Sequence, residues 1–255
     1  MRQSRGSDYI EIHGRQPVSE ALSNGWPVRE LVVRQGSKDA SLTEMISRAA
    51  SLGVKATLME APGFDRRFPR QSQGVVAVVR DVQTMNLDDV KRDIPPGQVP
   101  LFVALDGIED PHNLGAITRT CLAMGVHAVV VPKRRSASLG EGAAKSSAGA
   151  IFRQPICQVS NIHYFIEWAK REGLWVYGLD AGATSDIWNT DLTGPVALII
   201  GGEDRGLARL TREKCDFLVK IPMSGRIGSL NASVACGMAL AECQRQRQQK
   251  TSNRL

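Results

Sequence analysis

Apolar positions follow a short-period pattern up to Arg80 and a longer one from Pro100. Stretches with apolar residues three and four apart predict helices, and short runs rich in Val, Ile and Leu predict strands. In the first part the predicted helices are 16–23 and 42–52, and the predicted strands are 30–34, 54–58 and 74–79, with a loop over 61–73. Residues 9–80 are therefore expected to form a small α/β domain.

The second part alternates strands and helices over longer intervals. Its predicted strands are 101–105, 127–131, 174–179, 196–200 and 217–221, and its predicted helices are 113–124, 161–172 and 231–247, with short pieces near 138–147 and 207–213. Such alternation is typical of a mostly parallel sheet with helices on both faces. Residues 100–245 are therefore expected to form a larger α/β domain.

Three segments lack a periodic pattern. Residues 1–8 are predicted to be a flexible tail, residues 246–255 a Gln-rich disordered tail, and residues 81–99 a linker. The linker is rich in charged residues, contains Pro95-Pro96-Gly97, and has room for one helical turn at 87–91.

Composition excludes several classes of protein. Of the 255 residues, 42% are hydrophobic and 23% are charged, which is ordinary for a soluble globular protein. The chain has no apolar run long enough to span a membrane and no secretory signal after its basic start. Five scattered cysteines without a CxxC pair, and four histidines without ligand spacing, predict neither disulfides nor a metal site. We therefore expect a cytoplasmic protein, and the net charge of +6 favours an anionic partner.

Three loops that follow predicted strands carry polar residues, with glycines in or beside them. In the first, Asn113 begins a helix that Arg119 interrupts. In the second, Gly201-Gly202-Glu203 follows an apolar strand, and the third runs from Ile221 to Asn231 before the last helix. Open α/β sheets bind ligands at the carboxyl ends of their strands, so the loops predict one ligand site.

The same residues also have structural interpretations. Asn113 or Asn231 could cap a helix, and Gly201-Gly202 could form a plain turn or let the backbone approach a flat ligand. Because an unpaired buried charge is costly, Arg119 is expected to face a partner or an anionic ligand. The stretch 140–146 resembles a phosphate-binding loop but lacks its glycine spacing, so no nucleotide is expected there.

The three loops resemble the motifs of a known family. The motifs are Asp110-Pro-His-Asn-Leu-Gly115 with Arg119, Gly202-Glu-Asp-Arg-Gly206, and Ile221-Pro-Met223 with Ser229-Leu-Asn-Ala-Ser-Val234. In order and spacing they are similar to those of the SpoU (TrmH) branch of the SPOUT RNA methyltransferases. The segment 9–14 resembles the start of an L30e-like RNA-binding domain. Within the family, the likeness is greatest to enzymes that methylate a guanosine of 23S rRNA.

This resemblance implies a fold, a cofactor and a reaction. The fold is an α/β knot with a deep C-terminal trefoil, preceded by the small L30e-like domain. The reaction is methylation of an RNA ribose 2′-hydroxyl with S-adenosylmethionine, by a homodimer whose active site is completed across the subunit interface. The implied catalytic residues are Asn113, Arg119, Glu203, Ser229 and Asn231, and the implied cofactor contacts are Gly201, Gly202, Ile221, Met223, Leu230 and Asn231.

RNA contacts are expected from basic residues in loops and at helix starts. The candidates are Arg66, Arg67, Arg70, Lys133 and Arg134. Two alternatives stay open. The target could be a tRNA or another rRNA site, or the chain could be a non-catalytic RNA-binding or ribosome-assembly factor on the same fold.

Overall fold

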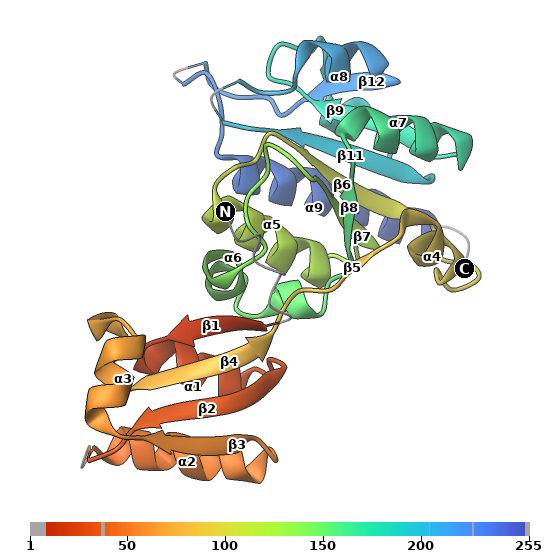
Figure 1. The fold of residues 1–255 in the computed structure, drawn as a ribbon. Helices are drawn as coiled ribbons and strands as arrows, with labels where there is room; N and C mark the ends of the chain where they lie inside the picture. Colours follow the sequence, from red (N-terminus) through yellow and green to blue (C-terminus); the bar gives the residue numbers. More distant parts are fainter. Residues whose placement is uncertain (1–8, 37–38, 204, 226, 253–255) are drawn as a thin grey trace.

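The computed structural model of the chain describes residues 9–36, 39–203, 205–225 and 227–252, so the predicted tail at 1–8 lies outside the described residues. Two α/β units follow one another along the chain, each built on its own sheet (Figure 1). The predicted α/β fold with a parallel sheet is confirmed. The knot that the family resemblance implies stays a prediction.

The smaller unit has, within the described residues, a four-stranded sheet in the order β1-β4-β2-β3. Its strands are β1 (Tyr9–His13), β2 (Val28–Arg34), β3 (Lys55–Met59) and β4 (Val75–Arg80), with β2 and β3 parallel. Its helices are α1 (Arg15–Ser23), α2 (Ala40–Ser51) and α3 (Ala61–Arg67), followed by the 3₁₀ turn η1 (Arg70–Ser72). The predicted loop over 61–73 is therefore wrong, because Phe64 and Phe68 are buried against Val32 and Val76 and hold α3 on the sheet.

The larger unit has an eight-stranded parallel sheet over the described part of the chain, in the order β10-β12-β9-β11-β6-β7-β8-β5. Its strands are β5 (Thr84–Met85), β6 (Leu101–Asp106), β7 (Ala128–Pro132), β8 (Ile156–Val159), β9 (Trp175–Leu179), β10 (Ser185–Asp186), β11 (Val196–Gly201) and β12 (Phe217–Lys220). Its helices are α4 (Leu87–Arg92), α5 (Pro111–Ala123), α6 (Glu141–Ser146), α7 (Ile162–Arg171), α8 (Arg209–Lys214) and α9 (Ala232–Ser252), with 3₁₀ turns η2 (Ala150–Phe152) and η3 (Ile187–Asn189). The five predicted strands are present, whereas β5, β8 and β10 were not predicted; β5 and β10 have two residues each and are too short to show a period.

Apolar side chains alternate between the two faces of the large sheet. Leu198 and Ile200 of β11 belong to the core under α5 and α9, whereas Ala197 and Ile199 face the side covered by α7 (Figure 1). Because both faces are covered, these strands are apolar at consecutive positions.

The predicted linker at 81–99 contributes structure to the larger unit. Strand β5 pairs with β8, and α4 buries Leu87 and Val90 in the core beneath α7. Trp168 Nε1 also donates a hydrogen bond to Asp88 Oδ1 (2.6 Å). The linker prediction is therefore wrong for residues 84–92, although the predicted helical turn at 87–91 is confirmed.

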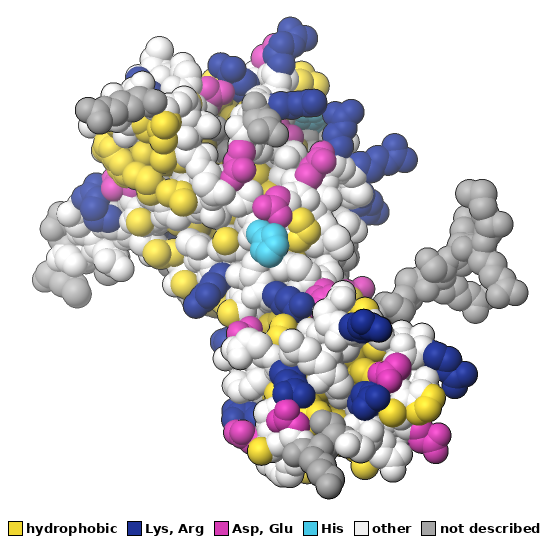
Figure 2. Space-filling model, turned by 90° about the vertical axis from the view of Figure 1, so that its left-hand side faces the viewer, with side chains coloured by type: hydrophobic (Ala, Val, Ile, Leu, Met, Phe, Trp, Pro, Cys, Tyr) yellow, Lys and Arg dark blue, Asp and Glu magenta, His cyan; other side chains and the backbone are white. Residues whose placement is uncertain are grey.

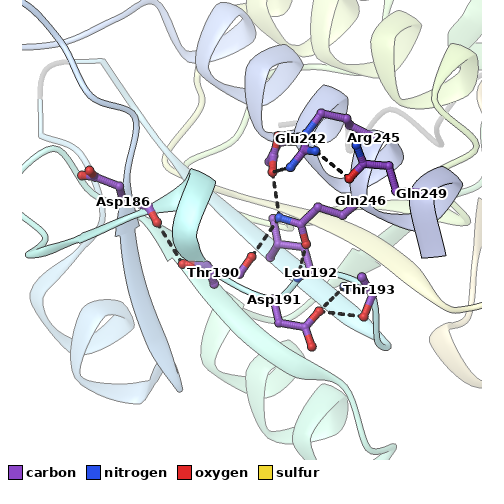
Figure 3. Close-up of polar contacts among 9 residues, drawn as sticks. All are labelled: Asp186, Thr190, Asp191, Leu192, Thr193, Glu242, Arg245, Gln246 and Gln249. Carbon is purple, nitrogen blue, oxygen red and sulfur yellow. Dashed lines mark hydrogen bonds and ion pairs between the residues drawn. The ribbon is translucent and has the colours of Figure 1, made fainter. Parts of the chain in front are cut away.

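The predicted disordered tail at 246–255 is helical up to the end of α9 at Ser252. Gln246 exchanges hydrogen bonds with the backbone of Thr190 and Leu192 (2.9 and 2.8 Å; Figure 3). Arg247 donates to backbone carbonyl oxygens in the segments that precede β6 and β11, at 2.8 to 3.1 Å. These bonds fasten the polar end of α9 to the sheet, which explains why the prediction fails.

Candidate active site

The three candidate loops meet at the carboxyl edge of the large sheet. Strands β6 and β11 are parallel neighbours with Gly201 opposite Asp106, so the loops that follow them begin side by side. The first leads to Asn113 on α5, and the second carries Glu203. The third loop joins β12 to α9 and ends at Asn231, which is hydrogen-bonded to Asn113.

One hydrogen-bond network joins residues from all three loops. Glu203 Oε1 accepts from Asn113 Nδ2 (3.0 Å) and from the backbone N–H of Ala232 (3.3 Å). Asn231 Nδ2 donates to Asn113 Oδ1 (2.9 Å) and also to Glu203 Oε1. Because three donors converge on one carboxylate oxygen, Glu203 fixes the orientation of both amides.

The helix caps separate structural roles from candidate catalytic ones. Asp110 caps α5 by accepting from the backbone N–H of His112 (2.9 Å), so Asn113 is not the cap of that helix. Asn231 does cap α9, because its Oδ1 accepts from the backbone N–H of Ser233 (2.9 Å). Asn231 therefore serves both the cap and the network, whereas Asn113 serves the network.

A cavity of about 380 Å³ lies beside this network. Five of the six predicted cofactor contacts line it, and so do two predicted catalytic residues: Gly201, Gly202, Ile221, Met223 and Leu230, with Glu203 and Ser229. Among the described residues, Asn113, Arg119 and Asn231 are outside the lining. The volume suits a small-molecule ligand.

The sequence does not predict the wall of the cavity that follows β9. Leu179, Asp180 and Ala181 line it, and Asp180 Oδ2 pairs with Arg212 Nε at 2.9 Å. The other oxygen of Asp180 accepts from the backbone N–H of Gly182 (2.8 Å). Because β9 neighbours β11, the rule that ligands bind at carboxyl strand ends indicates this segment, but no sequence motif marks it.

The glycines at the end of β11 are required by the packing of the chain. A Cβ on Gly201 would lie 2.3 Å from the backbone of Gly206, and one on Gly202 would lie 2.7 Å from the carbonyl oxygen of Gly107. The missing side chains therefore make room for neighbouring backbone, and the expected approach of a flat ligand to these glycines stays a prediction. Their own backbone still lines the cavity.

Arg119 lies on α5 but outside the network. Its side chain is exposed and forms no hydrogen bond or ion pair with any described residue. Leu114 and Ile117 occupy the buried side of α5, and position 119 faces away from it. The expectation of a paired Arg119 is therefore not met within this chain.

The candidate RNA contacts of the smaller unit are engaged within that unit. Arg67 Nη2 pairs with Glu11 Oε1 (3.2 Å), and Arg66 Nε donates to a carbonyl oxygen of its own helix (3.1 Å). Arg70 lies near the Asp65 carboxylate. A neighbouring carboxylate thus balances part of the charge of Arg67 and Arg70, whereas the Arg66 bond is to a neutral carbonyl.

The candidate RNA contacts of the larger unit are different. Lys133 and Arg134 follow β7, are exposed, and have no side-chain partner among the described residues. Arg135 follows in the left-handed conformation, with φ of 56°. On the face shown in Figure 2, Lys and Arg side chains lie on both units with Asp and Glu among them, so this face has no single dense basic patch.

Other site chemistries find little support among the described residues. No group of His, Cys, Asp and Glu side chains in that part of the chain could hold a metal ion. None of its helices has the length and apolar character that crossing a membrane requires. Burial raises the pKa of the Cys157 and Cys243 thiols to about 12, so they are not nucleophiles at neutral pH.

Comparison of the sequence with models of known protein families shows which family the chain belongs to. The sequence model of the SpoU rRNA Methylase family matches residues 100–241. The chain belongs to this family. The model for RNA 2′-O ribose methyltransferase substrate binding matches residues 12–85. The membership expected from the three motifs is confirmed.

Individual relatives cover nearly the whole chain. YacO of Bacillus subtilis strain 168, provisionally assigned to the TrmH family of tRNA/rRNA methyltransferases, is 40% identical over 96% of this chain and 98% of its own length. The 23S rRNA (guanosine-2′-O-)-methyltransferase RlmB of Coxiella burnetii is 39% identical over 93% of this chain and 96% of its own. The crystal structure of the SpoU methyltransferase AviRb from Streptomyces viridochromogenes, in complex with the cofactor AdoMet, has a TM-score of 0.72 and 28% identity, covering 95% of this chain and 92% of that one.

Proposed function

We propose that this chain uses S-adenosylmethionine to methylate a ribose 2′-hydroxyl of RNA, and that its target is a guanosine of 23S rRNA. The observation that carries the proposal is the network of Asn113, Glu203 and Asn231 beside a cavity at the carboxyl edge of the sheet. The target is supported by the 39% identity to RlmB of Coxiella burnetii. Action in the cytoplasm is part of the proposal.

The cavity fits this cofactor. AviRb, the structural relative described above, was solved with AdoMet. In this chain, Leu179, Ile221 and Leu230 offer apolar surface for a purine ring, and the carboxylate of Glu203 suits a cationic ligand that carries ribose hydroxyls. When bound, the cofactor supplies a methyl group on a positively charged sulfur.

The network would hold the target ribose in line with that methyl group. Asn113 and Asn231 are already oriented by Glu203, so little rearrangement is needed when RNA binds. Ser229 lines the cavity and is placed to hold the cofactor or the ribose. Positioning of this kind contributes several kcal/mol to many enzymatic rate enhancements.

Arg119 would act on the phosphate and the developing alkoxide of the target nucleotide. A guanidinium stays protonated in proteins, so it is a poor general base but a strong hydrogen-bond donor to anionic oxygen. Arg119 is exposed, has no partner among the described residues, and does not line the cavity of its own subunit. We therefore propose a homodimer in which Arg119 of one subunit completes the site of the other.

Two other functions are less well supported. A tRNA target is consistent with the tRNA/rRNA description of YacO, and the site itself does not distinguish the RNAs. A non-catalytic RNA-binding factor would have no need for a carboxylate that orients the amides of Asn113 and Asn231 beside a cavity.

Mapping of 2′-O-methylation in total RNA tests the proposal. We expect one guanosine of 23S rRNA to lose its 2′-O-methyl group when the gene is deleted and to regain it on complementation. Loss of a methyl group from a tRNA instead would mean that the target is that tRNA. An unchanged methylation map in all RNA would contradict the enzymatic function.

A further inference from the structure

Helix α6 lies between the small sheet and α5, the helix that carries Asn113 (Figure 1). On one side, the backbone N–H of His13 at the end of β1 donates to Glu141 Oε1 (3.1 Å). On the other side, Ser146 Oγ lies 3.1 Å from the carbonyl oxygen of Pro111, the first residue of α5. The same short helix therefore contacts the smaller unit, which matches the substrate-binding family model, and the start of α5, two residues before Asn113.

Helices α6 and α5 pack so closely that two positions between them have no space for a side chain. A Cβ on Gly115 of α5 would lie 1.9 Å from Ser146 Oγ and 2.7 Å from the carbonyl oxygen of Ala143. A Cβ on Gly142 would lie 3.1 Å from the ring of Pro111. Closely packed elements of this kind shift together.

Trp26 of the smaller unit contacts the segment just after α6. It lies between α1 and β2, is 5% exposed, and its ring lies 5.4 Å from that of Phe152. Its indole lies against Gly149, where a Cβ would be 1.8 Å from Nε1 and 2.3 Å from Cδ1. Gly149 has a φ of 79°, so this position favours glycine for its backbone as well.

The indole of Trp26 is held by shape and apolar contact. Its Nε1 is buried and has no hydrogen-bond partner among the described residues. A buried N–H without an acceptor is unfavourable, so the polar group does not explain the position of the ring. A phenylalanine ring should therefore replace it, whereas an alanine should not.

We propose that Trp26 is a positioning residue that docks the substrate-binding unit on 141–152 and so fixes the distance from bound RNA to Asn113. The proposal rests on the proposed methylation of RNA. RNA held by the smaller unit then meets the network at a defined place, because Trp26 contacts the segment after α6 and α6 itself contacts the first turn of α5. Trp26 touches neither the cavity nor the network, so its replacement should leave the cofactor site intact.

Five variants of the full chain test this role: Trp26→Ala, Trp26→Phe, Gly149→Ala, Gly173→Ala, and Trp26→Ala with Gly149→Ala. Gly173 is the matched control, since its φ is 77° and a Cβ there would meet nothing within 4 Å. Single-turnover methylation of 23S rRNA and cofactor affinity are measured on each folded variant.

We expect Trp26→Ala and Gly149→Ala to slow methyl transfer about 10- to 100-fold at saturating RNA, since misplacement by about 1 Å has such effects. Cofactor affinity should stay unchanged, and Trp26→Phe should retain a rate within about three-fold of wild type. The double variant should be no slower than the single ones, because both remove the same contact. A wild-type rate in folded Trp26→Ala, or equal effects of Gly149→Ala and Gly173→Ala, would overturn the proposal.

Solution scattering of the same variants separates this inference from the proposed function. We expect a larger radius of gyration for Trp26→Ala than for wild type, because the two units lose their contact. An unchanged radius in folded Trp26→Ala contradicts the docking role. If wild type methylates no RNA while the radius still increases, the proposed function fails and the docking contact stands.

Discussion

The two regions expected to contact RNA differ in how their polar groups are bound. At the carboxyl edge of the large sheet, Glu203 orients the amides of two residues from distant parts of the chain, while Arg119 is left exposed without a partner among the described residues. In the smaller unit, the candidate arginines are engaged by their own neighbours, as Arg67 is by Glu11. The first region is arranged for chemistry on a ligand that binds later, and the second is a surface whose charges are partly balanced.

This difference changes where phosphate contacts are expected. A cation that already has an ion-pair partner gains less from a phosphate than one that has none. Among the described residues, Arg119, Lys133 and Arg134 of the larger unit are without a side-chain partner, and so are the exposed Lys55 and Arg80 of the smaller unit. Among the candidate RNA contacts, Lys133 and Arg134 would then gain more from a phosphate than Arg67, which is already paired with Glu11.

The largest effect is expected at Arg119. Arg119→Ala should reduce methyl transfer about 100- to 1000-fold, the cost of removing a donor to developing negative charge. Cofactor affinity, measured by calorimetry, should stay within about two-fold, because Arg119 does not line the cavity. Arg171→Ala, an exposed arginine on α7, is the control and should be fully active.

Mixed dimers sharpen this prediction. Equal amounts of Arg119→Ala and Glu203→Gln subunits, refolded together, should recover about a quarter of wild-type activity, since half the dimers would have one complete site. Recovery requires Arg119 to act across the interface. No recovery in dimers that do form would place Arg119 and Glu203 in the same subunit's site.

The next effect is expected at Glu203. Glu203→Gln keeps an oxygen acceptor but removes the negative charge, so the three hydrogen bonds that orient Asn113 and Asn231 become weaker. Methyl transfer should fall about 100-fold, with a smaller loss of cofactor affinity. Glu213→Gln on α8, where the carboxylate is exposed, is the matched control. Full activity of Glu203→Gln would show that the charge of the Glu203 carboxylate is not needed for methyl transfer.

A smaller effect separates the two basic regions directly. For Lys133→Ala and Arg134→Ala, the slope of log affinity for RNA against log salt should become shallower by about 1 each. Arg67→Ala should change the slope less, because its guanidinium is already paired with Glu11. Filter binding over a range of salt concentrations measures all three. A larger change in slope for Arg67→Ala than for the other two would mean that the smaller unit supplies the stronger phosphate contacts.

The smallest effect concerns the end of α9. Hydrogen bonding to Arg245 lowers the pKa of the Glu242 carboxyl below its usual 4.5. Glu242 therefore contributes stability that is complete above pH 4.5 and is lost as the pH falls through its folded-state value. Glu242→Gln should cost about 1 kcal/mol in urea unfolding at pH 7. The difference from wild type should shrink below pH 4.5; a difference that is constant with pH would contradict this role.

The elements that the sequence predicts well are those with long apolar runs. Strand β11 and the glycines after it stand out because the strand is buried on both faces and the neighbouring backbone excludes side chains. The motifs around Asn113, Glu203 and Asn231 identify the residues of the network. Their mutual hydrogen bonds are tertiary, however, and no local pattern specifies them.

The failed predictions also have tertiary causes. The polar end of α9 is helical because Gln246 and Arg247 bond to loops far away in sequence. Asp180 lines the cavity without any motif, because strand order places β9 beside β11. Arg119 was expected to face a partner or an anionic ligand because its neighbours are apolar; the helix turns position 119 outward, so the partner is absent among the described residues and the anionic ligand stays a prediction. Trp26 has no signal in the sequence, because its contact with Gly149 joins the two units.

The most direct test of the central claim is methyl transfer by the purified protein. Unmodified 23S rRNA is incubated with the protein and S-adenosylmethionine carrying a labelled methyl group, and the RNA is digested and analysed by mass spectrometry. We predict one labelled 2′-O-methylguanosine per rRNA, formed about 100-fold more slowly with Glu203→Gln. Tight binding of the cofactor without label in any RNA, including tRNA, would contradict the account.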